Sequence, residues 1–255
     1  MLLTIDIGNT NITLGIFEGD QLTYHWRLAS DSARMPDEYG LQLLGLFRSS
    51  DLHLEELSDV VLASVVPPLT SHLQTACQDY LSKSPTIIES QHCEPIINRY
   101  DPPQAVGIDR LVNAVVVEKK YGLPACVVDF GTATTFDAID RDYNYLGGAI
   151  APGVGISLDA LVSHTAKLPK VDLQLPEHVI GRNTTQAMQS GLLWGYIAMV
   201  EGMVARFRTE LGEDTQVIAT GGLAPLVCNH TTSIDVIDPW LTLEGLYLIW
   251  ERMHP

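Results

Sequence analysis

Two short stretches of the chain each place an aspartate, a glycine and several hydroxyl or amide side chains at the end of an apolar run. Residues 4–13 read Thr-Ile-Asp-Ile-Gly-Asn-Thr-Asn-Ile-Thr, with Asp6 as the acidic residue. Residues 126–135 read Cys-Val-Val-Asp-Phe-Gly-Thr-Ala-Thr-Thr, with Asp129 in the matching place. A carboxylate at a strand end beside a glycine turn can hold a hydrated magnesium ion, while turn amides and threonine hydroxyls approach phosphate oxygens. The pattern therefore indicates nucleotide binding.

Each stretch taken alone has a second interpretation, which is ordinary hairpin chemistry, because Asp, Asn and Gly are residues that tight turns favour. The same order of strand, Asp, apolar residue, Gly, polar residue and Thr nevertheless returns in the second half of the chain. This repetition favours binding over a bare hairpin, and it indicates a duplication at the scale of a domain. A further glycine turn, Gly221-Gly222, follows an apolar run and is a third candidate for approaching the adenine or ribose.

The first half of the chain contains strand and helix patterns that would hold the first turn in place. The stretch around the first aspartate is a hairpin, and an alternating third strand follows at 21–28. Pro36 opens a helix with apolar residues spaced three apart, and the continuous apolar run 60–66 is typical of a buried parallel strand. A helix over 69–81 and a short strand at 86–88 come next, so the order predicts a mixed α/β sheet.

A helix separates the two halves of the chain. Its apolar residues fall on one helical face, and it begins near Asp109 and ends near Gly122. We therefore place the domain boundary at this helix, with one domain over 1–119 and the other over 120–255.

The second half restarts with the hairpin of the second aspartate and continues with a strand at 145–150. Asn183 is the predicted N-cap of a long helix that reaches Phe207, with Gln186 completing a capping box. Asp238, which precedes a proline, is the predicted cap of a closing helix.

The charge balance excludes some classes of partner. The chain has 15 basic and 31 acidic residues, a formal net charge of −16, and no basic cluster. We therefore expect no binding to nucleic acid or to an anionic membrane. The chain opens on a strand without a basic n-region, and no apolar stretch approaches the roughly 20 residues of a membrane span. These features predict a soluble cytoplasmic protein.

The cysteines give no sign of a disulfide framework or a metal site. None of the four forms a CxxC pair, so we expect reduced thiols. His92 and Cys93 are adjacent but lack a matching ligand pair, which argues against zinc.

Four motifs follow one another along the chain: Asp-Ile-Gly-Asn-Thr at 6–10, Gly-Ile-Asp-Arg at 107–110, Asp-Phe-Gly-Thr-Ala-Thr-Thr at 129–135 and Gly-Gly-Ala-Ile-Ala-Pro-Gly at 147–153. In their sequence and their order they resemble the motifs of type III pantothenate kinase, and the resemblance covers nearly the whole chain. It implies the fold of the acetate and sugar kinase, Hsc70 and actin superfamily. That fold has two duplicated ribonuclease-H-like domains, with mixed sheets flanked by helices and an ATP cleft between them.

The resemblance also implies ATP-dependent phosphorylation of pantothenate at its primary hydroxyl, which gives 4'-phosphopantothenate and begins coenzyme A biosynthesis. Asp109 matches the family's catalytic base, and Arg110 is a candidate partner of the pantothenate carboxylate. Without the resemblance, Asp109 would be a helix-dipole residue, Arg110 a surface ion pair, Tyr100 core packing and Thr184 a helix cap. The positions that match the family's substrate-binding residues are Tyr100, Gly107, Ile108, Asp109, Arg110 and Thr184.

The nucleotide and its cations are assigned by the same resemblance. Asp129 matches a site for a monovalent cation, K⁺ or NH₄⁺, and we assign Asp6 to the magnesium and phosphate end of the ATP site. The residues expected to bind ATP are Asp6, Ile7, Gly8, Asn9, Thr10, Asn11, Ile12, Thr13 and Thr132.

The family forms homodimers in which the partner completes the pantothenate pocket, so the resemblance implies a homodimer here. The long helix over 183–207 is the candidate carrier of that contact. Its apolar residues fit either a core or an interface, and they are Leu192, Tyr196, Met199, Met203 and Phe207.

The chain departs from the family at two positions. Thr13 stands where many relatives have lysine, and Pro102 stands where asparagine is common. Neither position carries a proposed catalytic group.

Two rival functions remain: a kinase of this fold that acts on another small hydroxy acid, and a non-catalytic regulatory homologue. A substrate panel separates the first rival, while the second is opposed by the presence of all four candidate site residues, Asp6, Asp109, Arg110 and Asp129.

Overall fold

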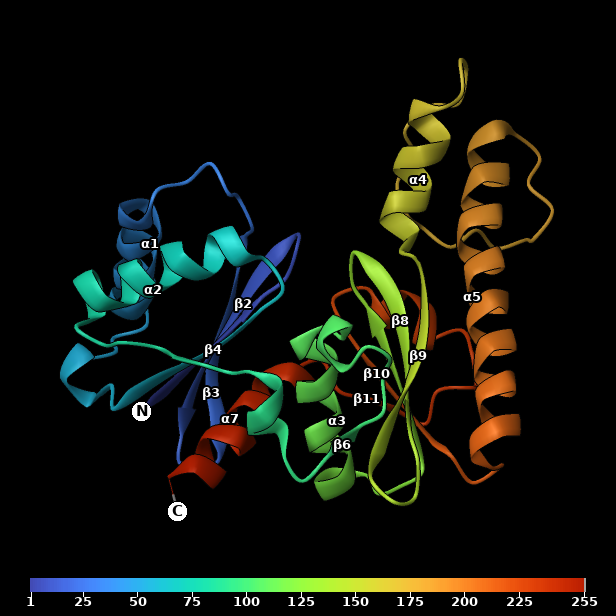
Figure 1. Cartoon of the computed structure of the whole chain (residues 1–255). Coiled ribbons are helices and arrows are strands. Elements are labelled where there is room, and N and C mark those ends of the chain that lie inside the picture. The colour runs from blue at the N-terminus through green and yellow to red at the C-terminus, as the bar shows by residue number, and fades with distance from the viewer. Residues whose placement is uncertain (255) are drawn as a thin grey trace. The chain divides into compact units, whose positions relative to one another are not determined.

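The computed structural model describes residues 1–254, which form two compact units, each built on one sheet (Figure 1). The first unit comprises Met1–Ile96, Asp101–Val116 and the chain from Leu241 onward. The second comprises Ile97–Tyr100 and Val117–Trp240. The units are therefore not consecutive halves of the sequence.

The sheet of the first unit has the strand order β3-β2-β1-β4-β5. The pairs β1–β2 and β2–β3 are antiparallel, whereas β4 and β5 join in parallel. The alternating runs form the antiparallel part, and the continuous apolar run forms β4, which lies between two neighbours. The strands are β1 (Leu2–Ile7), β2 (Asn11–Glu18), β3 (Gln21–Ala29), β4 (Asp59–Ser64) and β5 (Thr86–Ile87).

The two faces of the first sheet are covered by different helices. Leu3 and Ile5 of β1 belong to one buried cluster with α1 (Pro36–Ser49) and α2 (Pro67–Leu81). Thr4 points to the opposite face, because side chains alternate along a strand. That face meets α7 (Leu241–Met253), which in turn packs on α3 (Ile108–Lys120): a Cβ on Gly245 would lie 2.5 Å from the carbonyl oxygen of Val112.

The second unit repeats the first sheet. Its strand order is β11-β10-β7-β8-β9-β6, so β7 to β11 take the places of β1 to β5, with the same antiparallel and parallel pairs. The predicted duplication is confirmed at this level, and β6 is an addition at the edge. The strands are β6 (Ile97–Asn98), β7 (Ala125–Phe130), β8 (Ala133–Ile139), β9 (Asn144–Pro152), β10 (Gln216–Thr220) and β11 (Val236–Ile237).

Three helices complete the second unit: α4 (Val154–Ser163), α5 (Thr184–Leu211) and α6 (Ala224–Cys228). α4 and the first half of α5 run side by side and extend past the ends of β8 and β9 (Figure 1). The second half of α5 packs on the sheet, where Phe207 contacts Phe136 with ring centroids 5.9 Å apart.

The predicted cap of α5 is confirmed, with one change. The Asn183 side chain accepts a hydrogen bond from the Gln186 N–H at 2.9 Å. The Gln186 side chain accepts from the N–H of Arg182, at 3.0 Å, rather than from that of Asn183. The capping box therefore reaches one residue further back, to Arg182 in the preceding loop.

The cap predicted at Asp238 lies three residues before α7, which begins at Leu241, although Asp238 Oδ1 accepts a hydrogen bond from the N–H of Trp240 at 3.1 Å. The Asp238 carboxylate accepts hydrogen bonds from Lys120 Nζ at 2.8 Å and from Tyr121 Oη at 2.6 Å. It therefore joins the end of α3 to the segment before α7 within the second unit.

The predicted division at 119 and 120 differs from the compact units chiefly at two places: Ile97–Tyr100 belongs to the second unit, and α7 belongs to the first. Tyr247 of α7 stacks on Phe17 of β2, with ring centroids 4.8 Å apart. Burial of this apolar helix face assigns the end of the chain to the first unit.

Among the described residues, no helix is both long and apolar enough to cross a membrane. The four cysteines are buried free thiols. Burial raises the pKa of Cys77 to about 12 and that of Cys228 to about 11, so both thiols stay protonated near neutral pH.

We expect Gly245→Ala to lower the free energy of unfolding by roughly 1–3 kcal/mol, because the new methyl group would overlap α3. Gly45→Ala in α1 is the matched control. A Cβ there meets nothing within 4 Å, so alanine should leave the stability unchanged or raise it by up to about 1 kcal/mol. Urea unfolding followed by circular dichroism measures both, and equal stabilities would contradict the packing of α7 on α3.

Candidate active site

The first aspartate turn lies at the end of β1 and is tied down by backbone hydrogen bonds. Asp6 lies opposite Thr13 in the ladder of β1 and β2. The N–H of Gly8 donates to the carbonyl oxygen of Asn11 at 3.0 Å, which closes the turn. Ser30 fixes it from outside, because its hydroxyl donates to the carbonyl oxygen of Gly8 at 2.6 Å. Ile7 and Ile12 are buried below it, while Asn9, Thr10 and Asn11 are exposed.

The start of α3 lies beside the same end of the first sheet. Val65, which follows β4, donates its N–H to the carbonyl oxygen of Ile7 at 3.1 Å. A Cβ on Gly107 would be only 3.6 Å from Cγ1 of Val65. The structure therefore brings the Gly107–Arg110 motif to the strand end that carries Asp6, within one unit.

The Asp109 carboxylate occupies space that is open only because residue 107 is a glycine. Asp109 Oδ1 accepts a hydrogen bond from the Arg110 N–H at 2.9 Å, in the first turn of α3. A Cβ on Gly107 would lie 2.4 Å from the same oxygen, which is a collision. Only glycine at 107 leaves this carboxylate where it is. Ile108 and Asp109 are partly buried.

Arg110 is only 6% exposed. A surface ion pair, its alternative role, does not fit this burial. A cation at this depth can attract an anionic group into a strongly acidic protein more effectively than an exposed one, because water screens it less.

The second aspartate turn is tighter than the first and is surrounded by glycines. Asp129 lies opposite Thr135, and the N–H of Gly131 donates to the carbonyl oxygen of Ala133 at 3.1 Å. Gly221 follows β10 with φ +91°, and a Cβ there would lie 2.5 Å from Asp129 Oδ1.

Thr132 lies at the exposed tip of this second turn. Its carbonyl oxygen accepts a hydrogen bond from the N–H of Gly153 at 3.1 Å. A Cβ on Gly153 would lie 2.4 Å from that oxygen, so the start of α4 approaches the turn as closely as a backbone can.

Tyr196 of α5 supports the second turn from the buried side. Its hydroxyl forms a hydrogen bond with Thr134 Oγ1, and its ring lies 6.2 Å from that of Phe130. Burial, and then the charge of Asp129, raise the pKa of Tyr196. The phenol therefore stays protonated and keeps its hydrogen bond across the neutral pH range.

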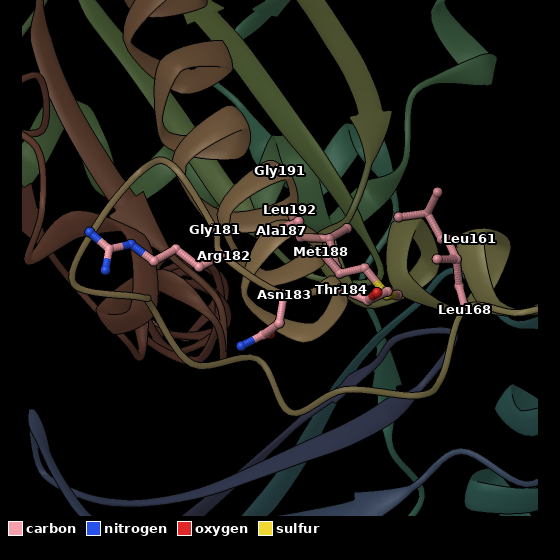
Figure 2. Close-up of a pocket in the computed structure, with 10 residues that line it drawn as sticks. All are labelled: Leu161, Leu168, Gly181, Arg182, Asn183, Thr184, Ala187, Met188, Gly191 and Leu192. Carbon is pink, nitrogen blue, oxygen red and sulfur yellow. The ribbon is translucent and has the colours of Figure 1, made fainter.

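A pocket of about 750 Å³ opens beside the N-terminus of α5. In Figure 2, Thr184 and Met188 of α5 face Leu161 and Leu168 of the α4 region, while the Arg182 side chain points away. The residues that line it are Leu161, Leu168, Gly181, Arg182, Asn183, Thr184, Ala187, Met188, Gly191 and Leu192. Thr184 is thus the first residue of a helix and lies in a mostly apolar cavity, which suits a small ligand with few polar groups.

Tyr100 lies in the second unit, directly after β6. It is half-buried, and its ring centroid lies 6.3 Å from that of Tyr145. One face of the ring is thus packed, and the residue is neither a core side chain nor a fully exposed one.

Within residues 1–254, no group of three or more His, Cys, Asp or Glu side chains is arranged to hold a metal ion. Any cation at Asp6 or Asp129 would therefore need other oxygen ligands, such as phosphate, backbone carbonyl groups or water, in addition to one carboxylate.

The family model of type III pantothenate kinase matches residues 2–206, which include both aspartate turns and the Gly107–Arg110 motif. The chain belongs to the type III pantothenate kinase family. The type III pantothenate kinase of Moorella thermoacetica is 51% identical over 252 residues, which cover 99% of both chains. That of Brevibacillus brevis is 48% identical with the same coverage.

Two solved structures share the fold of this member of the family. A conserved putative Baf family transcriptional activator from Campylobacter jejuni superposes with a TM-score of 0.64 at 20% identity and covers 98% of both chains. A putative 2-dehydro-3-deoxygalactonokinase from Sinorhizobium meliloti gives a TM-score of 0.57 at 12% identity, with 100% and 97% coverage. These likenesses confirm the predicted fold class.

The site residues expected in this type III pantothenate kinase fall into two groups. The Asp6 turn, Asp109 and Arg110 belong to the first unit, whereas Tyr100, the Asp129 turn and Thr184 belong to the second. The steric roles of Gly107 and Gly153 were not predicted, although both lie in recognised motifs. The sequence predicts that the Gly221-Gly222 turn approaches the adenine or ribose, but it does not predict the contact of Gly221 with Asp129, because that contact depends on the pairing of β10 with β7.

Proposed function

We propose that this chain transfers the terminal phosphoryl group of ATP to the primary hydroxyl of pantothenate, forming 4'-phosphopantothenate and ADP in the first step of coenzyme A synthesis. The observation that carries this function is membership of the type III pantothenate kinase family, with about half of the residues identical to named members across the whole chain. The duplicated sheets with an aspartate turn in each unit support ATP as the donor.

Asp109 is the proposed catalytic base. The hydroxyl oxygen of pantothenate forms a bond to the terminal phosphorus, the bond from that phosphorus to the bridging oxygen of ADP breaks, and the hydroxyl proton passes to the Asp109 carboxylate. The transition state of phosphoryl transfer is loose, so orientation of the hydroxyl matters more than strong basicity, and a carboxylate suffices. The hydrogen bond from the Arg110 N–H to Asp109 Oδ1, in the space that Gly107 leaves open, supports this role, because a fixed carboxylate can orient a hydroxyl.

Arg110, Tyr100 and Thr184 are the proposed contacts to pantothenate. The burial of Arg110 suits a charge-assisted hydrogen bond to the pantothenate carboxylate. The apolar walls around Thr184 suit the dimethyl and methylene groups of the substrate, with the hydroxyl and the helix N-terminus as polar groups. Tyr100 contributes a half-buried ring.

The Asp6 turn is the proposed site for the ATP phosphates and Mg²⁺. Its exposed amide and hydroxyl side chains are neutral donors, and Asp6 supplies one hard oxygen ligand. When bound, Mg²⁺ neutralises charge that develops on the phosphate oxygens. Thr13 offers a hydroxyl and no cation, so the turn amides carry more of the phosphate contact here.

Asp129 is the proposed site of K⁺ or NH₄⁺, with Thr132 as an ATP contact. Gly221 leaves room for the Asp129 carboxylate, because a Cβ there would lie 2.5 Å from Asp129 Oδ1, and this carboxylate can supply one oxygen ligand to a monovalent cation. A cation there would lower the repulsion between this acidic unit and the nucleotide.

We expect Asp109→Asn to lose turnover by about 100- to 10,000-fold, because the amide cannot accept the hydroxyl proton. The fold and the affinity for ATP should remain, since the amide oxygen can still accept the Arg110 N–H. Asp79→Asn is the matched control, because it removes one exposed carboxylate from the same unit. Coupled ADP release measures turnover, and wild-type turnover in Asp109→Asn would remove this residue from the mechanism.

We expect activity to require K⁺ or NH₄⁺, and full rates in Na⁺ alone would contradict a cation site at Asp129. Gly221→Ala should raise the K⁺ concentration for half-maximal activity about tenfold, because its methyl group would displace the Asp129 carboxylate. Gly122→Ala carries similar backbone strain, with φ +87° and no neighbour within 4 Å, and should leave the K⁺ dependence unchanged.

A homodimer is the last part of the proposal. Exposed apolar side chains occur on β9, α4 and the segment before α5, and we infer that they contribute to the interface. They are Ile150, Ile156, Leu161, Val179 and Ile180.

Light scattering should give twice the chain mass of 28.0 kDa, and Ile150→Ser should shift the protein toward the monomer. Leu41→Ser is the matched control, because Leu41 is 62% exposed and Ile150 64%, but Leu41 lies on α1 of the first unit. A monomeric wild-type chain would contradict the dimer.

A further inference from the structure

The second sheet carries a strand that the first sheet lacks, and this strand leads directly to Tyr100. β6 joins β9 in parallel, with Asn98 opposite Tyr145. The pairing continues past the strand, because the N–H of Arg99 donates to the carbonyl oxygen of Tyr145 at 2.9 Å. The Asn98 side chain then accepts the N–H of Tyr100 at 3.0 Å. The backbone of Tyr100 is thus fixed to the edge of β9.

β9 is irregular where it meets the Tyr100 ring. The register of β8 and β9 shifts by one residue just before Gly147, so Leu146 is the extra residue of a bulge. Gly147 has φ +116°, which favours glycine. A Cβ on Gly147 would lie 3.3 Å from Cδ2 of Tyr100, tighter than ordinary packing. The bulge and the glycine together leave the space that the ring occupies.

Tyr145 packs against the Tyr100 ring and is itself anchored by a buried carboxylate. Its hydroxyl donates to Asp137 Oδ1 at 2.7 Å, and Thr135 Oγ1 donates to Asp137 Oδ2 at 2.9 Å. Asp137 and Tyr145 are both 0% exposed. Burial of a carboxylate is costly unless its oxygens accept hydrogen bonds. The hydrogen bond from Thr135 therefore holds the Asp137 carboxylate, and the carboxylate in turn fixes the orientation of the Tyr145 ring.

We propose that Tyr145 and Gly147 are positioning residues for pantothenate recognition and act through Tyr100. Asp137 orients the Tyr145 ring, and the missing side chain of Gly147 lets the Tyr100 ring lie against β9. This inference rests on the proposed function, in which Tyr100 contacts pantothenate. Loss of a contact that binds the ground state and the transition state equally raises KM and leaves kcat unchanged. Displacement of Tyr100 should therefore appear in the KM for pantothenate.

The test compares kinetic constants of three variants with those of the wild-type chain. Gly147→Ala should raise the KM for pantothenate about tenfold, while kcat and the KM for ATP stay within about twofold. Gly122→Ala introduces similar backbone strain at a position where the new Cβ meets no atom within 4 Å. Its kcat and KM values should therefore match those of the wild type. Tyr145→Phe keeps the ring but removes the hydroxyl that anchors it on Asp137. This variant should also raise the KM for pantothenate. Thermal unfolding of each variant shows that it is folded at the assay temperature.

Two outcomes would overturn the inference alone. They are a pantothenate KM in Gly147→Ala equal to that in Gly122→Ala, and a loss confined to kcat. A wild-type chain that releases no ADP with pantothenate would instead overturn the proposed function, and the substrate assigned to Tyr100 with it.

Discussion

Two of the three candidate functional carboxylates, those of Asp109 and Asp129, each depend on a glycine that leaves room for them. A Cβ on Gly107 would lie 2.4 Å from Asp109 Oδ1, and one on Gly221 would lie 2.5 Å from Asp129 Oδ1. Both separations are far below van der Waals contact, so any side chain at either glycine would displace an acid. One glycine precedes a helix and the other follows a strand, so the same steric constraint is met in two different ways.

The two sheets share one strand order, and each unit adds its own parts to that common sheet. The second unit adds β6 at its edge and extends α4 and α5 past its strands. The first unit takes α3 and α7 on one face. The common sheet supplies two equivalent aspartate turns, which are the proposed sites for phosphate and cations, whereas the additions carry Tyr100 and Thr184. The proposed ATP contacts therefore lie on the sheet that both units share, whereas Tyr100 and Thr184, two of the proposed pantothenate contacts, lie on the parts that the second unit adds.

Local patterns predicted most elements, because a hairpin or helix depends on neighbouring residues. The turns at Asp6 and Asp129, the duplication and the cap at Asn183 all followed from short stretches of sequence. Partners far apart in the chain were missed: Asp238 also accepts hydrogen bonds from Lys120 and Tyr121, which lie 118 and 117 residues away. The support beneath Tyr100 was missed for a similar reason. The role of the buried Asp137 carboxylate becomes visible only when the hydroxyls that donate to it are known.

The place of α7 has a consequence for folding during synthesis. The ribosome releases β1 to β5 first, but α7, which covers the Thr4 face of that sheet, emerges only after the whole of Val117–Trp240. Domains usually fold in the order in which they are made. Here the second unit can complete its core while the first still exposes one face of its sheet. The nascent chain therefore carries an open apolar surface for most of its synthesis, and this surface is a natural target for chaperones.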